Sequence, residues 1–206
     1  MKINCTKAGK RFNRDWIFRD FTYEFIKGSH YAITGPNGSG KSTLLQVIAG
    51  AIVSSEGNIS YESGSTKKLV SDEIFNFISI AAPYLEVVEE MTVNELLHFH
   101  QIFKPFIPGI AIPDIINRMG LQVASNKQIR YYSSGMKQRV KLAQAIFSDT
   151  PCLLLDEPCT NLDESGTRLY HQLIKEYCQN RLVIVSSNEK QEYSFCGEVV
   201  NIMSYK

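Results

Sequence analysis

A glycine-rich loop near the start of the chain carries the residue types that bind phosphate groups. The run Gly35-Pro36-Asn37-Gly38-Ser39-Gly40-Lys41-Ser42 fits the pattern G-x-x-x-x-G-K-[ST], and Thr43 follows it. Glycines let the backbone turn tightly, so that successive N–H groups point at one anion. The Lys41 ammonium would reach the β- and γ-phosphates of a nucleotide, and the Ser42 hydroxyl would bind Mg²⁺. This loop predicts a nucleoside triphosphate site.

Two adjacent carboxylates supply the second half of a hydrolytic site. Asp156 and Glu157 follow the apolar run Cys152-Leu153-Leu154-Leu155 and precede Pro158. Asp156 at the carboxyl end of a buried strand is placed to hold Mg²⁺. Glu157 would polarise a water that attacks the γ-phosphate. Alone, the pair would read as an acidic turn, but together with the phosphate loop it predicts hydrolysis.

The elements that must position these residues form a layered α/β core. The first thirty residues alternate apolar and polar side chains, which predicts half-buried antiparallel strands. Three short runs are instead continuously apolar, as expected of parallel strands covered on both faces. They are Tyr31–Ile33, Cys152–Leu155 and Leu182–Val185. A helix is expected from about Lys41 to Ala49, with its positive end directed at the phosphates.

The middle of the chain reads as a helical insertion. Thr92-Val93-Asn94-Glu95 forms a capping box, and Leu96, Phe99 and Phe103 follow at helical spacing. A second helix is expected from about Ser134 to Phe147, with an apolar stripe along one side. We therefore predict one domain over 1–206, with a core of 1–76 and 149–206 and a helical subdomain of about 77–148.

Composition limits the class of protein. The 22 Lys and Arg residues nearly balance the 21 Asp and Glu, giving a formal net charge of +1. This balance argues against a chain that mainly binds nucleic acid or coats an anionic membrane. No run approaches the ~18 apolar residues of a membrane-spanning helix, and the N-terminus lacks the pattern of a signal peptide. With five cysteines and no C-x-x-C pair, a reduced cytoplasmic setting fits best.

These motifs resemble the nucleotide-binding subunit of an ATP-binding cassette (ABC) transporter, and the resemblance spans nearly the whole chain. The segment Tyr132-Ser133-Ser134-Gly135-Met136-Lys137-Gln138-Arg139 is similar to the family signature L-S-G-G-Q followed by x-Q-R, with matches at Ser133 and Gly135. The resemblance implies a P-loop NTPase core with a parallel sheet, an antiparallel β subdomain near the N-terminus and a small helical insertion. It also implies ATP and Mg²⁺ as cofactors, and contact of Ser133 and Gly135 with ATP held by an opposite subunit.

Further family positions follow from the same resemblance. Thr160-Asn161-Leu162-Asp163 is similar to the segment that crosses the dimer seam. Phe12 lies where the family places an aromatic side chain on adenine. A core position for Phe12 is the open alternative, and Trp16 is the competing aromatic.

Two positions depart from the family pattern. By spacing, Ala82 stands where the family has a glutamine that touches Mg²⁺ and the attacking water. Asn188 stands where the family has a histidine that contacts the γ-phosphate. Alanine cannot bind metal, and an amide donates a hydrogen bond but is no proton carrier near neutral pH. Slow hydrolysis is the expectation.

The resemblance implies a cytoplasmic ATPase that dimerises around ATP, with itself or a paralogous subunit, and drives a separate membrane permease. The alternative is a hydrolysis-impaired nucleotide-binding regulatory subunit, which Ala82 and Asn188 favour and Glu157 opposes. A relative that acts on DNA or ribosomes would need coiled coils, zinc motifs or a second cassette, so no nucleic-acid partner is expected. At the joint where the family receives its permease, Tyr84, Leu85, Val87 and Val88 predict a partly exposed apolar group with an acidic rim of Glu86, Glu89 and Glu90. A buried strand edge is the open alternative.

Overall fold

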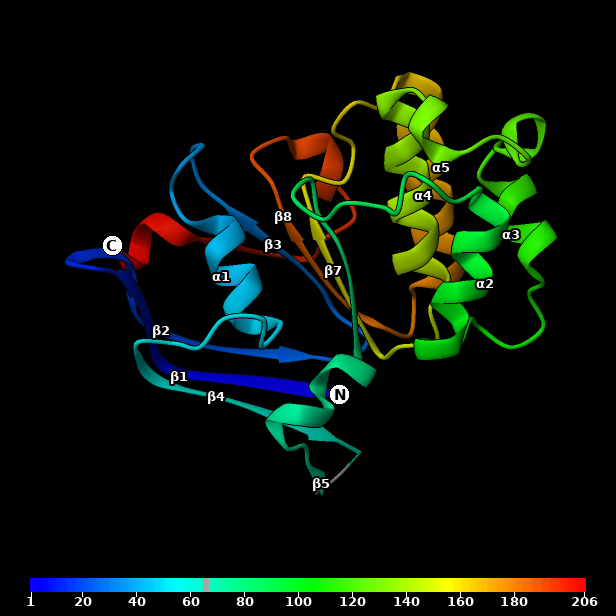
Figure 1. Ribbon diagram of the computed structural model, residues 1–206. Helices are drawn as coiled ribbons and strands as arrows, with labels where there is room; N and C mark the ends of the chain where they lie inside the picture. The colour runs from blue at the N-terminus through cyan, green and yellow to red at the C-terminus, as the bar shows by residue number, and fades with distance from the viewer. Residues whose placement is uncertain (65–66) are drawn as a thin grey trace.

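The computed structural model describes residues 1–64 and 67–206 of the chain. It contains two β-sheets and five α-helices of seven or more residues within that described part (Figure 1). The α-helices are α1 Lys41–Ile48, α2 Val93–Phe103, α3 Ile112–Arg118, α4 Ser134–Phe147 and α5 Glu164–Tyr177. Short 3₁₀ helices are η1 Ser71–Asn76, η2 Gln122–Ala124, η3 Ile129–Tyr131, η4 Lys190–Tyr193 and η5 Ile202–Tyr205.

The N-terminal strands form an antiparallel sheet in the order β2-β1-β4-β5. Its strands are β1 Lys2–Phe12, β2 Asp15–Ile26, β4 Glu56–Ser63 and β5 Lys67–Lys68. Along β2, Phe18, Phe21 and Phe25 are fully buried, whereas the residues between them are mostly exposed or half-buried. The predicted antiparallel, half-buried strands are therefore confirmed.

A five-stranded parallel sheet forms the centre of the molecule, in the order β6-β7-β8-β3-β9. Its strands are β6 Ile78–Ala81, β7 Cys152–Asp156, β8 Leu182–Ser186, β3 His30–Thr34 and β9 Glu198–Asn201. The three predicted apolar runs are the adjacent strands β7, β8 and β3. Every residue of β7 and β8 is buried, as the continuous apolar pattern predicts.

The start of the helical insertion needs a correction. The sequence pattern predicts a start near residue 77, but Ile78–Ala81 is strand β6 and pairs in parallel with β7. Four residues that include a serine are too short to show a period, so the sequence pattern did not distinguish this strand from the helical segment after it. The core sheet therefore continues to Ala81.

Alternate residues of the parallel sheet face two separate hydrophobic cores. Leu153, Leu155 and Val185 pack in one core with α4 and α5. Leu154 and Ile184 pack in the other with α1 and the antiparallel sheet. Figure 1 accordingly places α1 on one side of the parallel sheet and α4 on the other. The loops that begin these two helices are thus carried on opposite faces of the sheet.

The insertion helices begin where the sequence places them. Thr92 and Glu95 form the expected capping box at α2, and α4 runs from Ser134 to Phe147 as predicted. The apolar stripe of α2 is different, however, because Leu96 and its neighbours Val93 and Leu97 are buried, whereas Phe99 and Phe103 are exposed. None of the helices within residues 1–64 and 67–206 has both the length and the apolar composition that a membrane span requires.

The segment after β6 carries the predicted apolar group. Tyr84, Leu85 and Val88 are 37–44% exposed and Val87 is half-buried, so partial exposure is confirmed. The acidic rim differs from the expectation. Glu89 pairs with Lys137 at 2.5 Å, and Glu90 pairs with Arg130 at 3.5 Å. These ion pairs neutralise most of the rim.

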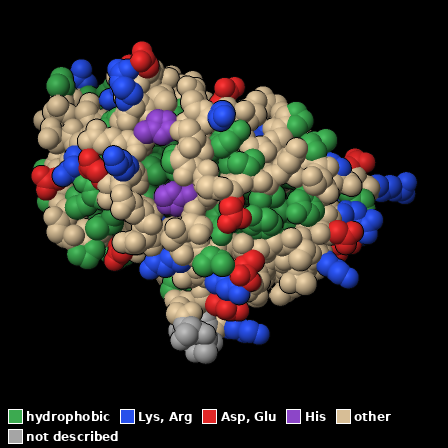
Figure 2. Space-filling view, turned by 180° about the vertical axis from the view of Figure 1, so that it is seen from behind, with side chains coloured by type: hydrophobic (Ala, Val, Ile, Leu, Met, Phe, Trp, Pro, Cys, Tyr) green, Lys and Arg blue, Asp and Glu red, His purple; other side chains and the backbone are tan. Residues whose placement is uncertain are grey.

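Charged side chains of both signs are interspersed on the face that Figure 2 shows, without a large patch of one sign. This distribution agrees with the near-zero net charge of the whole chain.

Candidate active site

The phosphate loop joins the end of β3 to the start of α1. Gly40 is the residue before the helix and has φ +95°, in the left-handed region that glycine adopts without strain. A Cβ at Gly40 would lie 2.3 Å from the Cγ2 of Ile17, so no side chain fits there. No side chain in the described residues caps the first N–H groups of α1. Those groups and the helix dipole are therefore available to an anion.

Lys41 is held inside this loop and is only 5% exposed. Its ammonium donates hydrogen bonds to the carbonyl oxygens of Gly35 at 2.9 Å and Pro36 at 3.2 Å. The charge is thus fixed at the point where the first turn of α1 opens. This is the position from which a lysine contacts the outer phosphates of a nucleotide.

Asp156 at the end of β7 has the properties of a metal ligand. The side chain is 2% exposed, and its Oδ1 has no hydrogen-bond partner among the described residues. Burial raises the pKa of Asp156, while the hydroxyls of Ser42 and Ser186 and the Lys41 charge oppose that rise. A buried carboxylate oxygen without a partner, beside a hydroxyl, suits a hard divalent cation. The residues present therefore fit Mg²⁺, which Asp156 and Ser42 would hold.

Glu157 follows Asp156 and turns towards the phosphate loop. Its φ is +43°, a conformation that costs energy for a residue with a side chain. Its N–H donates to the carbonyl of Ser186 at 2.9 Å, which ties the turn to β8. A cavity of about 240 Å³ is lined by Glu157 together with Ile17 and loop residues; the latter are Asn37, Gly38, Gly40, Lys41, Ser42 and Thr43. The strained turn thus places the carboxylate across from the phosphate-binding residues.

Ala82 and Asn188, the two positions that depart from the family pattern, follow the strands on either side of β7. Asn188 follows β8, is exposed, and lines a second cavity of about 300 Å³ with Asn37, Glu157 and Glu192. Ala82 follows β6 and is fully buried. Its methyl group has no atom that can bind a metal.

The signature segment lies in another part of the molecule. Ser133 caps α4 and accepts a hydrogen bond from the Met136 N–H at 3.3 Å. Ser133 and Gly135 line a cavity of about 410 Å³ with Asn161 and Asp163, and no phosphate-loop residue lines it. Since α1 and α4 lie on opposite faces of the parallel sheet, Ser133 is not brought to the phosphate loop of its own copy (Figure 1).

The two candidate aromatic residues lie on the β1–β2 hairpin. Phe12 is 49% exposed, which excludes the core alternative, and Lys10 lies over its ring at 5.0 Å. Trp16 is contacted by Arg11 at 5.6 Å and by Arg19 at 4.3 Å. Phe12 is therefore the aromatic side chain that is not enclosed between arginines.

Two residues of the site have no counterpart in the sequence predictions. Ile17 lines the phosphate cavity, but its place on a regular apolar–polar strand gave no signal. Glu192 lines the second cavity and is only 4% exposed, although it ends a polar run. Its proximity to Asn188 in sequence was the one available hint.

Comparison with known proteins identifies relatives that align with nearly the whole chain. A Bacillus subtilis protein described as an uncharacterized ABC transporter ATP-binding protein, YybJ, is 30% identical over 191 residues, which cover 92% of this chain and 87% of that protein. The cytochrome c biogenesis ATP-binding export protein CcmA of Rhizobium meliloti is 30% identical over 200 residues, covering 96% and 95%.

Solved structures share the fold at lower identity. A putative ABC transporter ATP-binding protein from Pyrococcus furiosus superimposes with a TM-score of 0.82 at 22% identity, with both chains fully covered. The dimeric structure of MJ0796, a bacterial ABC transporter cassette, gives a TM-score of 0.82 at 20% identity, covering 97% and 94%. Residues 18–160 match the ABC transporter family. The chain therefore belongs to the ABC transporter family.

Proposed function

We propose that this chain is an ATPase subunit that binds Mg-ATP, closes around it as a dimer and hydrolyses it to drive a separate membrane permease. The observation that carries the proposal is the cavity that Glu157 shares with Lys41 and Ser42. A carboxylate that faces phosphate-binding groups is placed to act on a water at the γ-phosphate.

Binding would use the phosphate loop, residues 35–43, as a cradle. The N–H groups at the start of α1 and the Lys41 ammonium would hold the β- and γ-phosphates. Asp156 and Ser42 would hold Mg²⁺, which neutralises charge on the phosphates when it is bound. Phe12 would stack on the adenine, since its ring is exposed at the hairpin end.

Hydrolysis would depend on Glu157, which orients the attacking water and accepts its proton. Asn188 would donate an amide hydrogen bond towards the γ-phosphate, in place of a cationic group. Because Ala82 supplies no metal contact, we expect slow turnover. The alternative role is a regulatory subunit that binds ATP without cleaving it. It is less favoured, because Glu157, whose φ is positive, lines the same cavity as the phosphate loop.

A second subunit would complete the site. Ser133 and Gly135 line a cavity separate from the phosphate loop of their own copy. In a head-to-tail pair, Ser133 and the N-terminus of α4 would contact the γ-phosphate held by the partner. The partner would be a second copy or a paralogous ATPase.

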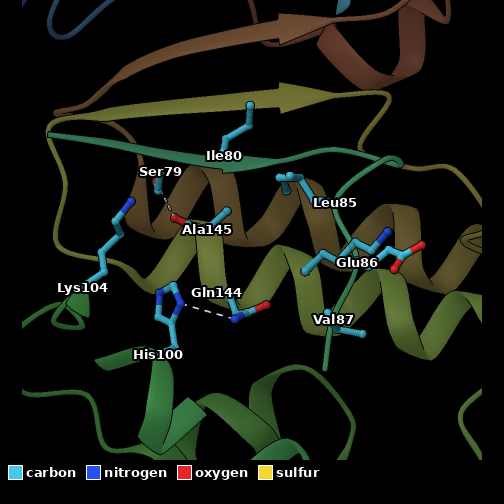
Figure 3. Close-up of a pocket in the computed structure, with 11 residues that line it drawn as sticks. Ser79, Ile80, Leu85, Glu86, Val87, His100, Lys104, Gln144 and Ala145 are labelled. Atoms are coloured by element: carbon cyan, nitrogen blue, oxygen red, sulfur yellow. Dashed lines mark hydrogen bonds between the residues drawn. The ribbon is translucent and has the colours of Figure 1, made fainter. Parts of the chain in front are cut away.

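The permease would dock at the groove between β6 and α4. This groove holds about 270 Å³ and is lined by apolar side chains of the segment after β6, including Leu85 and Val87 (Figure 3). His100 of α2 and Lys104, the residue after α2, lie at its other end, where Lys104 donates to the Ile78 carbonyl at 2.6 Å. An apolar cytoplasmic segment of the permease would fit here, with the ATPase on the inner face of the membrane. We propose a single domain of this kind, with the helical subdomain, which ends near 148, flanking the groove.

Two variants test the proposal. Lys41→Ala should remove most ATP affinity while leaving the fold intact, measured by calorimetry and circular dichroism. The matched control is Lys104→Ala, which also loses an ammonium bonded to a carbonyl but lies away from the phosphate loop. Glu157→Gln should bind Mg-ATP without cleaving it and form an ATP-dependent dimer by light scattering. Unchanged ATP affinity in folded Lys41→Ala would overturn the site.

A further inference from the structure

Glu192 is a buried carboxyl group in an otherwise exposed polar segment. It lies on η4, after four consecutive exposed residues that begin at Asn188, yet Glu192 itself is only 4% exposed. Its Oε1 accepts a hydrogen bond from the Cys159 N–H at 2.8 Å. Its Oε2 has no partner among the described residues. A buried carboxyl with one free oxygen is costly, so its presence at this place requires a reason.

The hydrogen bond of Glu192 reaches the turn that carries Glu157. Cys159 lies two residues after Glu157, and the Thr160 N–H donates to the Glu157 carbonyl at 3.1 Å. The positive φ of Glu157 is strained, so neighbouring contacts must hold it. The bond to Ser186 fixes one end of this turn, and the bond from Cys159 to Glu192 fixes the other.

The same carboxyl group also faces the loop that carries Asn188. The Ser187 hydroxyl lies beside it and, with the Cys159 N–H, opposes the effect of burial, which raises the pKa of Glu192. The carboxylates of Glu157 and Glu189 add to that rise. The Cys159 thiol and the Tyr170 phenol are also buried against Glu192, and their pKa values are raised, so both stay neutral near pH 7.

We propose that Glu192 is a positioning residue for ATP hydrolysis, which joins the Glu157 turn to the Asn188 loop across the cavity that all three residues line. This inference rests on the proposed function, because it assigns Glu192 a role through Glu157. Without the Glu192 acceptor, the Cys159 N–H loses its partner, and the strained Glu157 can relax away from the phosphate loop.

The test distinguishes three contributions of the Glu192 side chain: its hydrogen-bond acceptor, its charge and its packing. Glu192→Gln keeps an oxygen for the Cys159 N–H, Glu192→Leu removes it, and Glu192→Asp keeps the charge but is too short to reach. Tyr170→Phe is the matched control, because it removes the buried bond from the Tyr170 hydroxyl to the Glu192 carbonyl (2.9 Å) and leaves the carboxyl group in place. Each variant is measured for kcat, KM, ATP affinity and thermal stability.

We expect Glu192→Leu and Glu192→Asp to lower kcat by about 10-fold or more, while ATP affinity changes by less than about 2-fold. Glu192→Gln should keep kcat within about 3-fold. Tyr170→Phe should lose stability without a matching loss of kcat. If Glu192→Leu fails to fold, the Asp and Gln variants still decide the question. Two results would overturn the role of Glu192. One is an equal kcat in all folded Glu192 variants. The other is a loss of kcat that depends only on the loss of stability, at position 170 as well as at position 192.

Glu157→Gln distinguishes the two levels of failure. If Glu157→Gln still hydrolyses ATP at the original rate, the proposed function of Glu157 fails, and the role of Glu192 fails with it. If Glu157→Gln is inactive while Glu192→Leu turns over normally, only the positioning role is wrong.

Discussion

A Cβ at Gly135 would lie 2.8 Å from the carbonyl oxygen of Asn161. This contact joins the start of α4, which carries the signature segment, to the turn after Glu157. Asn161 itself has φ +65°, a left-handed conformation that asparagine adopts readily in turns. The two segments proposed to face a second subunit are therefore packed against each other within one copy.

Gly135→Ala should disturb this contact. Alanine normally stabilises a helix by about 1 kcal/mol relative to glycine, but here the methyl group has no room. We expect lower thermal stability and a weaker ATP-dependent dimer in the Glu157→Gln background, with ATP affinity of the single subunit unchanged. The measurements are thermal unfolding and light scattering. Gly197→Ala is the control, since a Cβ there meets no atom within 4 Å. A Gly135→Ala protein that is more stable and dimerises fully would contradict the packing argument.

Asp156→Asn should stabilise the protein in the absence of nucleotide. The buried Asp156 carboxylate has one oxygen without a partner in the described residues, and burial raises its pKa, so its charge opposes folding near pH 7. We expect the melting temperature to rise by on the order of 3 °C, while Mg²⁺-dependent ATP binding weakens. The exposed Asp149 provides the control, because Asp149→Asn should change neither quantity. A lower melting temperature in Asp156→Asn would count against this assignment.

His100 makes the fold sensitive to acid. Burial and, to a smaller extent, the Lys104 charge lower the pKa of His100 to about 4, although a hydrogen bond with Gln144 opposes both effects. In the unfolded chain His100 binds a proton near pH 6.5, so the folded state loses stability as pH falls from about 6.5 towards 4. His100→Gln should make the loss of stability over this range less steep, in denaturant titrations at each pH. His98→Gln, on the exposed side of α2, is the control. An unchanged slope in His100→Gln would show that other groups dominate.

Parts of the site that are built from residues close together in the sequence could be predicted from the sequence. The phosphate loop and the Asp156–Glu157 pair depend on glycines, one lysine and a strand end, all within a few residues of each other. The start of α4 was also predictable, because Ser133 is a good cap. The burial of Glu192 was not, since it depends on Cys159 and Tyr170, which lie more than twenty residues away. The exposure of Phe99 was missed for the same reason, because helical spacing does not say which side of α2 meets the core.

Asn188→His tests whether the absence of the family's histidine at position 188 limits turnover. Glu157, Lys41 and Ser42 share one cavity, so the groups for binding and for polarising water are placed. Asn188 lines the adjoining cavity with Glu157, but an amide carries no charge to the γ-phosphate. A preorganised donor at developing charge contributes ~10²-fold or more in rate, of which the amide retains part. We therefore expect Asn188→His to raise kcat by about 10-fold with little change in ATP affinity, in single-turnover phosphate release.

Gln191→His, which places an imidazole on another wall of the same cavity, should give no such increase. Fast hydrolysis in the unmodified protein, or a slower rate in Asn188→His, would mean that the Asn188 amide already serves this site.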